Sequence, residues 1–317
     1  MENMSSVGRP IVFLGLLELE RHWIPYSIGA LILYIITTLL CCLIIYVIWA
    51  EESLHEPMYL FIGNLLLNAV FGSTVVFPQF IVNLMSGCST ISFPECLFQA
   101  FCMQTFYTAE MLTFIAMAYD RYLAVGNPLR YSSIMTNVKA LTYVSIIWVF
   151  SFVLVMIPIV MTANLHVCGV TINNIYCENM SLVRLACGNS VNSLYGLIQS
   201  SLFLVCLFLI IVYCYVRTML ICLKLSRSSS LKAIHTLVTH IITFSIFLTG
   251  TLFVFLRYRL SSETISITAH VLLSMTGLLT SVIVNPIIYG IRTEALKLKL
   301  IHNLQNINVF KKVSQLN

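Results

Sequence analysis

The sequence predicts an all-α membrane protein, a bundle of seven transmembrane helices with its N-terminus outside the cell. Hydrophobic residues make up 59% of its 317 residues and charged residues only 9%, whereas a soluble domain carries about 25% charged residues. Seven apolar runs are long enough to form membrane-spanning helices, and the basic residues are distributed unevenly between the segments that separate them. These three observations define the fold class.

The seven apolar runs are separated by segments rich in Ser, Asn, Glu, Arg or Lys. A spanning helix needs about 20 residues, and each run provides them. The runs cover about residues 26–50, 58–82, 96–119, 140–163, 195–222, 233–256 and 266–289. We therefore expect an extracellular segment over residues 1–24, the helical domain over 25–290, and a cytoplasmic segment with a short amphipathic helix over 291–317.

The distribution of basic residues predicts the orientation. With the N-terminus outside, five of the 17 Lys and Arg residues lie in extracellular segments and twelve in cytoplasmic ones. Cytoplasmic loops carry the excess of basic residues in membrane proteins. The first cytoplasmic loop departs from this pattern, because it holds Glu51, Glu52 and Glu56 and no basic residue. Sequons at Asn3 and Asn179 lie on the predicted outer side, where we expect glycosylation.

Several functional classes lack support in the sequence. The basic residues form no block, which argues against nucleic-acid binding. No CxxC pair or zinc-type spacing is present, so we expect no metal or other cofactor. No span carries paired carboxylates or a Ser/His/Asp set, so we do not expect an enzyme. A transporter or channel for a small solute is the alternative, although the spans offer only Glu110 with scattered Asn and Gln for a polar path.

The segment from Met117 to Tyr131 reads Met-Ala-Tyr-Asp-Arg-Tyr-Leu-Ala-Val-Gly-Asn-Pro-Leu-Arg-Tyr. It resembles the signature of vertebrate odorant receptors, a branch of the rhodopsin-like G-protein-coupled receptors. Further matches are Leu54 to Tyr59, Lys232-Ala233 with Thr236 and His240, and Asn285 to Tyr289. The resemblance covers about residues 10–300. It implies a plasma-membrane receptor that binds a small odorant and activates a stimulatory or olfactory-type G protein, which raises cyclic AMP.

The resemblance assigns one group of residues to G-protein coupling and switching: Asp120, Arg121, Tyr122, Tyr215, Asn285, Pro286 and Tyr289. In the family this Arg is held at rest and meets the G protein on activation, when the two tyrosines outside the triplet approach it. Pro286 interrupts the helical hydrogen bonds and gives the seventh span a place to bend. The alternatives are an interfacial anchor pair, tyrosines of an aromatic belt, and a kink without a signalling role.

Glu110 is an acid in the middle of the third span. Burying it ionised is costly, so we expect it to be neutral or to pair with a polar group or ion. Ala69 and Cys41 stand where the family has an Asp and an Asn. Those groups usually build a hydrated, sodium-binding cluster, and only Asn285, Glu110 and Asn68 remain of it. We therefore expect this member to switch differently from its relatives.

The resemblance also implies two disulfides in the outer loops, because disulfides persist outside the cell. It pairs Cys96 with Cys177 and Cys168 with Cys187, which would hold the second extracellular loop over the mouth of the bundle. A metal site that combines the loop cysteines with His166 is the alternative. Its spacing fits no standard zinc pattern.

The ligand site is expected in the outer half of the bundle, where pockets between helices are mostly apolar. Analogy with the family places ten residues there: Met103, Gln104, Tyr107, Thr108, Gln199, Phe203, Leu248, Thr251, Phe255 and Arg259. The spacing of the first four puts them on one helical face. Arg259 corresponds to a basic residue of the fish-like branch, where a guanidinium can hold a carboxylate. Ordinary helix packing, and for Arg259 a solvated loop arginine, are the alternatives.

Overall fold

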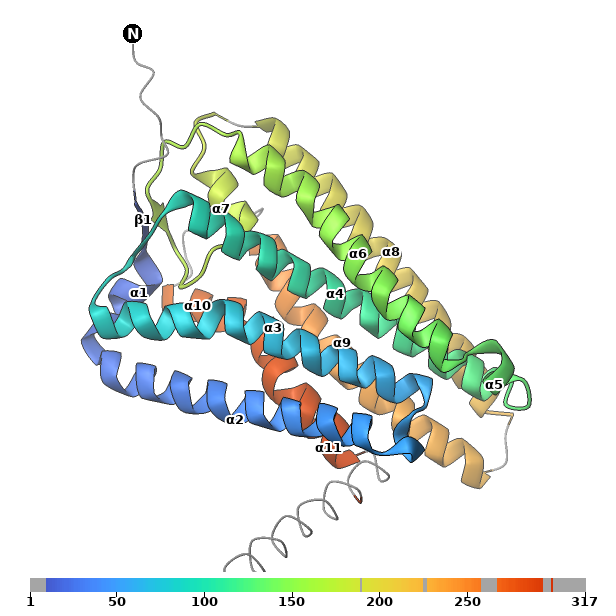
Figure 1. The fold of residues 1–317 in the computed structure, drawn as a ribbon. Coiled ribbons are helices and arrows are strands. Elements are labelled where there is room, and N and C mark those ends of the chain that lie inside the picture. Colours follow the sequence, from blue (N-terminus) through green and yellow to red (C-terminus); the bar gives the residue numbers. More distant parts are fainter. Residues whose placement is uncertain (1–9, 189, 225–226, 258–266, 293–297, 299–317) are drawn as a thin grey trace, which may run out of the picture.

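Long helices dominate the computed structural model of the chain (Figure 1), which describes all residues except 1–9, 189, 225–226, 258–266, 293–297 and 299–317. The long helices are α2 (Trp23–Ala50), α3 (Pro57–Ser86), α4 (Phe93–Gly126), α6 (Asn137–Ala163), α8 (Ser190–Cys222), α9 (Arg227–Arg257) and α10 (Ile267–Leu279). A π-helical turn, η4 (Thr280–Val284), joins α10 to α11 (Asn285–Arg292). The cytoplasmic segment expected over residues 291–317, with its short amphipathic helix, lies outside the described residues except for residues 291, 292 and 298.

Six helical segments are long and apolar enough to cross a membrane within the described ranges. They are Leu14–Ala50, Pro57–Ser86, Asn137–Ala163, Val191–Cys222, Leu237–Leu256 and Val271–Gly290. Large apolar side chains on their outer faces are exposed, for example Leu39 at 64% and Trp49 at 76%. Such a surface suits lipid and not water. The chain is therefore a multi-pass membrane protein, while the count of seven spans stays a prediction.

The remaining long helix, α4, lies inside the bundle. It contacts α3, α6, α8 and α9, and Figure 1 shows it running between α3 and the pair formed by α6 and α8. Its buried face includes polar groups such as Gln99, Glu110 and Asp120. These groups make α4 less apolar than α3, α6 and α8, and they place its polar chemistry inside the bundle.

Helix boundaries follow from local sequence. Ser92 and Glu95 form a capping box at the start of α4, where each side chain bonds the other's backbone N–H. Thr136 caps α6 by accepting a hydrogen bond from the backbone of Lys139. Gly87 ends α3 with a φ of 65°, a left-handed conformation that glycine adopts without steric cost.

A small sheet that the sequence did not predict lies at one end of the helical bundle, and the described chain is otherwise mostly helical. Its strands are β1 (Ile11–Phe13), β2 (Thr90–Ile91) and β3 (Thr171–Ile172), in the order β2-β1-β3. The first strand pairs antiparallel with β2 and parallel with β3. Strands of two or three residues carry no detectable sequence periodicity, so this sheet could not be predicted. It ties the segment before the first span to two later loops.

Shorter helical elements complete the described structure. They are α1 (Leu14–Leu19), η2 (Glu20–His22), η3 (Glu52–Leu54), α5 (Tyr131–Ile134) and α7 (Asn179–Arg184). The segment that holds β1 and α1 buries Ile11, Phe13 and Leu16, each about 1% exposed. The segment predicted over residues 1–24 is therefore not a free tail from residue 11 onward.

Candidate functional site

Two disulfides hold the loop between α6 and α8. Cys96, in the first turn of α4, is joined to Cys177, and Cys168 is joined to Cys187. Both pairs implied by the resemblance are present. All three loop cysteines of the alternative metal site are engaged in these disulfides, so they offer no thiolate to a metal.

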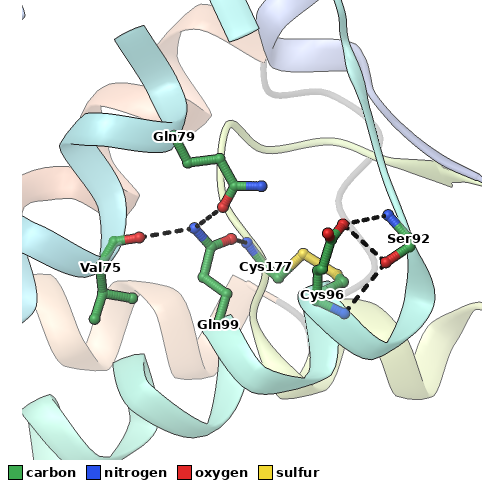
Figure 2. The surroundings of a disulfide bond; sticks show 7 residues. Val75, Gln79, Ser92, Cys96, Gln99 and Cys177 are labelled. Carbon is green, nitrogen blue, oxygen red and sulfur yellow. Dashed lines mark hydrogen bonds between the residues drawn. A yellow bond between two sulfur atoms is a disulfide. The ribbon is translucent and has the colours of Figure 1, made fainter. Parts of the chain in front are cut away.

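Gln99 strengthens the attachment of this loop. One turn after Cys96, its Oε1 accepts a hydrogen bond from the Cys177 backbone N–H at 2.8 Å. Its Nε2 donates to the Val75 carbonyl at 3.1 Å and to Oε1 of Gln79 at 3.0 Å. Figure 2 shows Gln99 between the disulfide and these two α3 residues. A single amide therefore joins α3, α4 and the loop.

A cavity of about 170 Å³ lies beneath the loop, between α4, α6, α7, α8 and α9. Eight of the ten residues predicted for the ligand site line it: Met103, Gln104, Tyr107, Thr108, Gln199, Phe203, Thr251 and Phe255. Leu248 does not line it and instead packs against the hydrophobic core, about one turn earlier in α9 than Thr251. Arg259 lies outside the described residues.

Sequence reasoning missed two further walls of the cavity. Leu154, Val155 and Pro158 contribute from α6, and Glu178, Asn179 and Met180 contribute from the start of α7 and the residue before it. The α6 residues belong to an apolar run without any distinguishing mark. The residues that begin with Glu178 directly follow the disulfide cysteine Cys177. Their position next to this cysteine is the sequence feature from which their place in the cavity wall could have been predicted.

Asn179, an expected glycosylation site, has a side chain that faces inward. It lines the cavity, and its Oδ1 accepts a hydrogen bond from the Thr162 hydroxyl at 2.7 Å. The amide oxygen of Asn179 therefore holds α7 to α6, and glycosylation of this residue stays a prediction. The other sequon, at Asn3, lies outside the described residues.

Aromatic rings lie below the cavity. Tyr107 lines the cavity, and its ring centroid is 5.0 Å from that of Phe106 and 5.8 Å from that of Phe247. Phe247 in turn lies 5.9 Å from Phe114. Such edge and tilted contacts between close-packed rings transmit a displacement because the interior has little free volume. The rings therefore connect the cavity wall to the middle of the bundle.

Glu110 is fully buried at the centre of the bundle. Its carboxylate accepts hydrogen bonds from Asn68 Nδ2 at 2.6 Å, from the Ser281 hydroxyl at 2.7 Å and from Asn285 Nδ2 at 2.7 Å. These donors come from α3, η4 and α11. The structure thus surrounds Glu110 with polar partners, and it adds Ser281 to the three polar residues named from the sequence.

Asp120 and Arg121 lie near the far end of α4. The buried Asp120 accepts a hydrogen bond from the Tyr131 hydroxyl at 2.7 Å, while Nε of Arg121 is 4.0 Å from its other oxygen. Burial, and secondly the Asp120 carboxylate, raise the pKa of the Tyr131 phenol, so it stays protonated and donates. Tyr122 packs its ring 6.5 Å from that of Tyr213 on α8. The tyrosine of α5 is thus the closest partner of Asp120, and sequence reasoning gave it no role.

Tyr289 and Tyr215 are buried inside the bundle at 2% and 8% exposure. This burial argues against the alternative of an interfacial aromatic belt. The Tyr289 hydroxyl lies 3.2 Å from His240 Nδ1 and 3.1 Å from the Thr243 hydroxyl. It therefore attaches α11 to α9. Pro286 lies two residues after the end of η4, in the first turn of α11, so the irregular turn lies close to where the proline was expected to let the seventh span bend.

The sequence profile described as "Olfactory receptor" matches residues 30–306. The chain belongs to the olfactory receptor family. It is similar to human olfactory receptor 52K1, with 32% identity over 97% of this chain and 99% of that protein. Similarity to human olfactory receptor 56A3 is 33% over 87% of this chain and 88% of that protein. Human olfactory receptor 52B6 is 32% identical over 88% of this chain and 84% of its own length.

Members of the olfactory receptor family are G-protein-coupled receptors and not enzymes. This olfactory receptor therefore belongs to that class, as the motifs from Met117 to Tyr131 and from Asn285 to Tyr289 predicted. Its cavity, its Glu110 cluster and its Tyr289 contacts lie along the bundle in the part of the chain covered by the match.

Proposed function

We propose that this olfactory receptor binds a small odorant in the cavity between α4, α6, α8 and α9. Binding changes the bundle so that its cytoplasmic face admits a stimulatory or olfactory-type G protein, which raises cyclic AMP. The observation that carries the proposal is the chain of packed rings that leads from the cavity wall into the bundle. Tyr107, Phe247 and Phe114 form this chain, and Phe114 lies about one helical turn after Glu110 on α4.

The proposed switch uses groups on separate helices. Glu110 joins α3, α4 and the seventh helical segment, and Tyr289 joins that segment to α9. A ligand that shifts α4 or α9 changes the lengths of these hydrogen bonds, and it favours whichever arrangement it binds more tightly. Arg121, 24% exposed beside Asp120, is the group that we propose meets the G protein.

The proposal places seven helices across the plasma membrane with the N-terminus outside. The central position of α4 supports it as the additional span, because its neighbours α3, α6, α8 and α9 surround it. Polar residues in a span are tolerated when they face the interior of the bundle. Twelve basic residues on the proposed cytoplasmic side support the orientation.

A cell assay that reads cyclic AMP against a panel of odorants tests the function. An active odorant should lose its response in Arg121→Ala, while the receptor still reaches the cell surface. The matched control is Arg130→Ala, which removes a basic residue outside the predicted switch set. A response that survives in Arg121→Ala at normal expression contradicts the role of this residue.

A transporter or channel is the second candidate. It requires a continuous polar path, and in the described residues the Glu110 carboxylate is closed in by Asn68, Ser281 and Asn285. Ligand-dependent current or solute flux without any cyclic AMP response would favour transport over the receptor function.

A further inference from the structure

Two glycines bring α9 and α10 closer together than any side chain would allow. A methyl group added at Gly250 of α9 would lie 2.7 Å from the backbone nitrogen of Gly277 in α10 and 3.2 Å from the Gly277 Cα. Non-bonded heavy atoms pack best about 3.5–4.0 Å apart, and the backbone of a helix cannot turn aside as a side chain can. A larger residue at position 250 therefore has to push the two helices apart.

Gly277 also receives the ring of Tyr107, which comes from α4. A methyl group at Gly277 would lie 2.8 Å from Cε1 of this ring and 3.6 Å from its hydroxyl oxygen. Three helices, α4, α9 and α10, therefore meet at a single glycine. We call this meeting point the glycine seat and define it by Tyr107, Gly250 and Gly277.

The Tyr107 ring is held in this seat by its other neighbours. Its centroid lies 5.0 Å from that of Phe106 and 5.8 Å from that of Phe247. Its hydroxyl is hydrogen-bonded to that of Tyr176, which is fully buried and directly precedes the disulfide cysteine Cys177. Since two aromatic rings and the disulfide-bonded loop hold the ring, a group that overfills the seat displaces α10 as well.

Tyr107 is at the same time part of the cavity wall. A ligand that displaces its ring toward α10 meets the backbone of Gly277, because the space between them does not hold even a methyl group. Close-packed interiors have little free volume in which such a displacement could be absorbed. Pressure on the ring from the cavity therefore passes to α10.

A shift of α10 reaches the groups proposed for the switch. Gly277 lies about one helical turn before Ser281, whose hydroxyl donates to Glu110 at 2.7 Å. The same helical segment continues through η4 into α11, where the Tyr289 hydroxyl lies 3.2 Å from His240 Nδ1 on α9. The seventh helical segment thus connects the glycine seat to Glu110 and to Tyr289.

We infer that Tyr107 is the positioning residue through which a ligand controls the contact between α9 and α10. With the ring in the glycine seat, the two helices stay in contact at Gly250. A ligand that displaces the ring moves α10 against α9 and favours the arrangement that admits the G protein. The inference rests on the proposed function of the cavity as the odorant site. It adds to the path through Phe247 and Phe114 a second path along the seventh helical segment.

The variant Gly277→Ala overfills the seat without any ligand. It should raise ligand-independent cyclic AMP, per receptor at the cell surface, about threefold or more, because the added methyl group disfavours the arrangement with the ring seated. Gly63→Ala is the matched control. It adds the same methyl group to α3, where the group meets open space, and should change cyclic AMP less than about twofold. Unchanged or lower cyclic AMP in Gly277→Ala overturns the inference.

A second substitution distinguishes this role from a general loss of packing. Tyr107→Leu removes the ring that the new methyl group meets, so the double variant Tyr107→Leu/Gly277→Ala should return cyclic AMP to within about twofold of Tyr107→Leu alone. Tyr107→Phe keeps the ring and should give no such rescue. Rescue by both substitutions, or by neither, contradicts the seating of the ring at Gly277.

Gly250→Ala separates the two contacts of the seat. Its methyl group meets the backbone of α10 and not the Tyr107 ring. It should also raise ligand-independent cyclic AMP, since it pushes α9 and α10 apart, but Tyr107→Leu should not reverse the rise. Reversal by Tyr107→Leu, or no rise in Gly250→Ala, overturns the assignment of control to the contact between α9 and α10.

Thermal unfolding of the receptor in lipid nanodiscs measures the same coupling without a G protein. Gly277→Ala should lower the midpoint by roughly 2–8 °C, the effect of overpacking an interior by one methyl group. Its loss and that of Tyr107→Leu should be less than additive in the double variant, and additive losses contradict the inference. If Gly277→Ala does not reach the cell surface, surface expression replaces cyclic AMP as the measurement. Recovery in the double variant then supports the seat, and no recovery overturns it.

The two kinds of measurement separate this inference from the proposed function. Less than additive losses in the unfolding midpoint, without cyclic AMP production by any variant or odorant, refute the signalling function and support the control of the α9–α10 contact by Tyr107. An odorant response in the unmodified receptor, with ligand-independent cyclic AMP that Gly277→Ala does not raise, refutes the inference and leaves signalling intact.

Discussion

Glu110 occupies a position where a buried charge is costly, and its surroundings explain how it is tolerated. Asn68, Ser281 and Asn285 all direct donors at its two oxygens. Ala69, which replaces the family's acid in the second span, is buried at 1% exposure and adds no polar group. One acid on α4 therefore collects the hydrogen bonds of the remaining polar residues.

Replacing Glu110 should show this dependence directly. Glu110→Ala removes the acceptor of three buried donor groups, of which Asn68 keeps a second acceptor, the Phe106 carbonyl at 3.0 Å. Since an unsatisfied buried donor costs about 1–3 kcal/mol, the variant should lower the stability by about 3 kcal/mol or more. Glu110→Gln keeps one acceptor oxygen and should cost about half as much. Thermal unfolding of the receptor in nanodiscs measures both. Equal midpoints for the two variants would mean that the donors find other partners.

At the level of elements, α4 organises the molecule. Gln99 attaches its outer end to α3 and to the loop, Glu110 its middle to η4 and α11, and Asp120 its far end to α5. Each attachment is a polar side chain on the buried face of one helix. A helix held at three levels can move only by exchanging these contacts, which suits a two-state element.

The attachment at Gln99 can be tested by hydrogen exchange. Gln99→Leu removes the acceptor for the Cys177 amide and both donations to α3, so the loop should lose about 2 kcal/mol of local stability. Faster amide exchange around Cys177, with the disulfide intact, is the expected result. Gln79→Leu is the matched control, because it removes one of these bonds and leaves the Cys177 amide paired. Equal exchange in both variants would rule out the central role of Gln99.

The whole molecule has apolar outer faces and a polar axis. Leu39 and Trp49 face outward, whereas Glu110 and Asn285 are completely buried. A soluble protein has the opposite arrangement, with its charged groups on the surface. It follows from placing the chain in lipid, where polar groups must find partners inside the bundle.

The proposed orientation leads to a prediction for the whole receptor. An epitope tag before Met1 should bind antibody on intact cells, and a tag after Asn317 only after permeabilisation. The reason is the excess of Lys and Arg in the segments placed inside. Labelling of the C-terminal tag on intact cells would reverse the topology or change the number of spans.

The sequence by itself determined the membrane class, the position of the long helices and the receptor family. Apolar runs and ordered motifs are local properties of the sequence. The motif from Asp120 to Tyr122 can therefore be recognised without knowledge of any tertiary contact. It also named eight of the residues that line the cavity, because helical spacing and resemblance place Met103 and Gln104 on one face.

Only the tertiary structure decided which polar groups meet. Ser281 at Glu110, Tyr131 at Asp120, Glu178 in the cavity and the strand Ile11–Phe13 all depend on contacts between segments far apart in the chain. No local pattern encodes such a contact, since a side chain's partner is set by how the helices pack and how the loop is folded over them. For the same reason Leu248, assigned to the cavity by analogy, packs into the core instead.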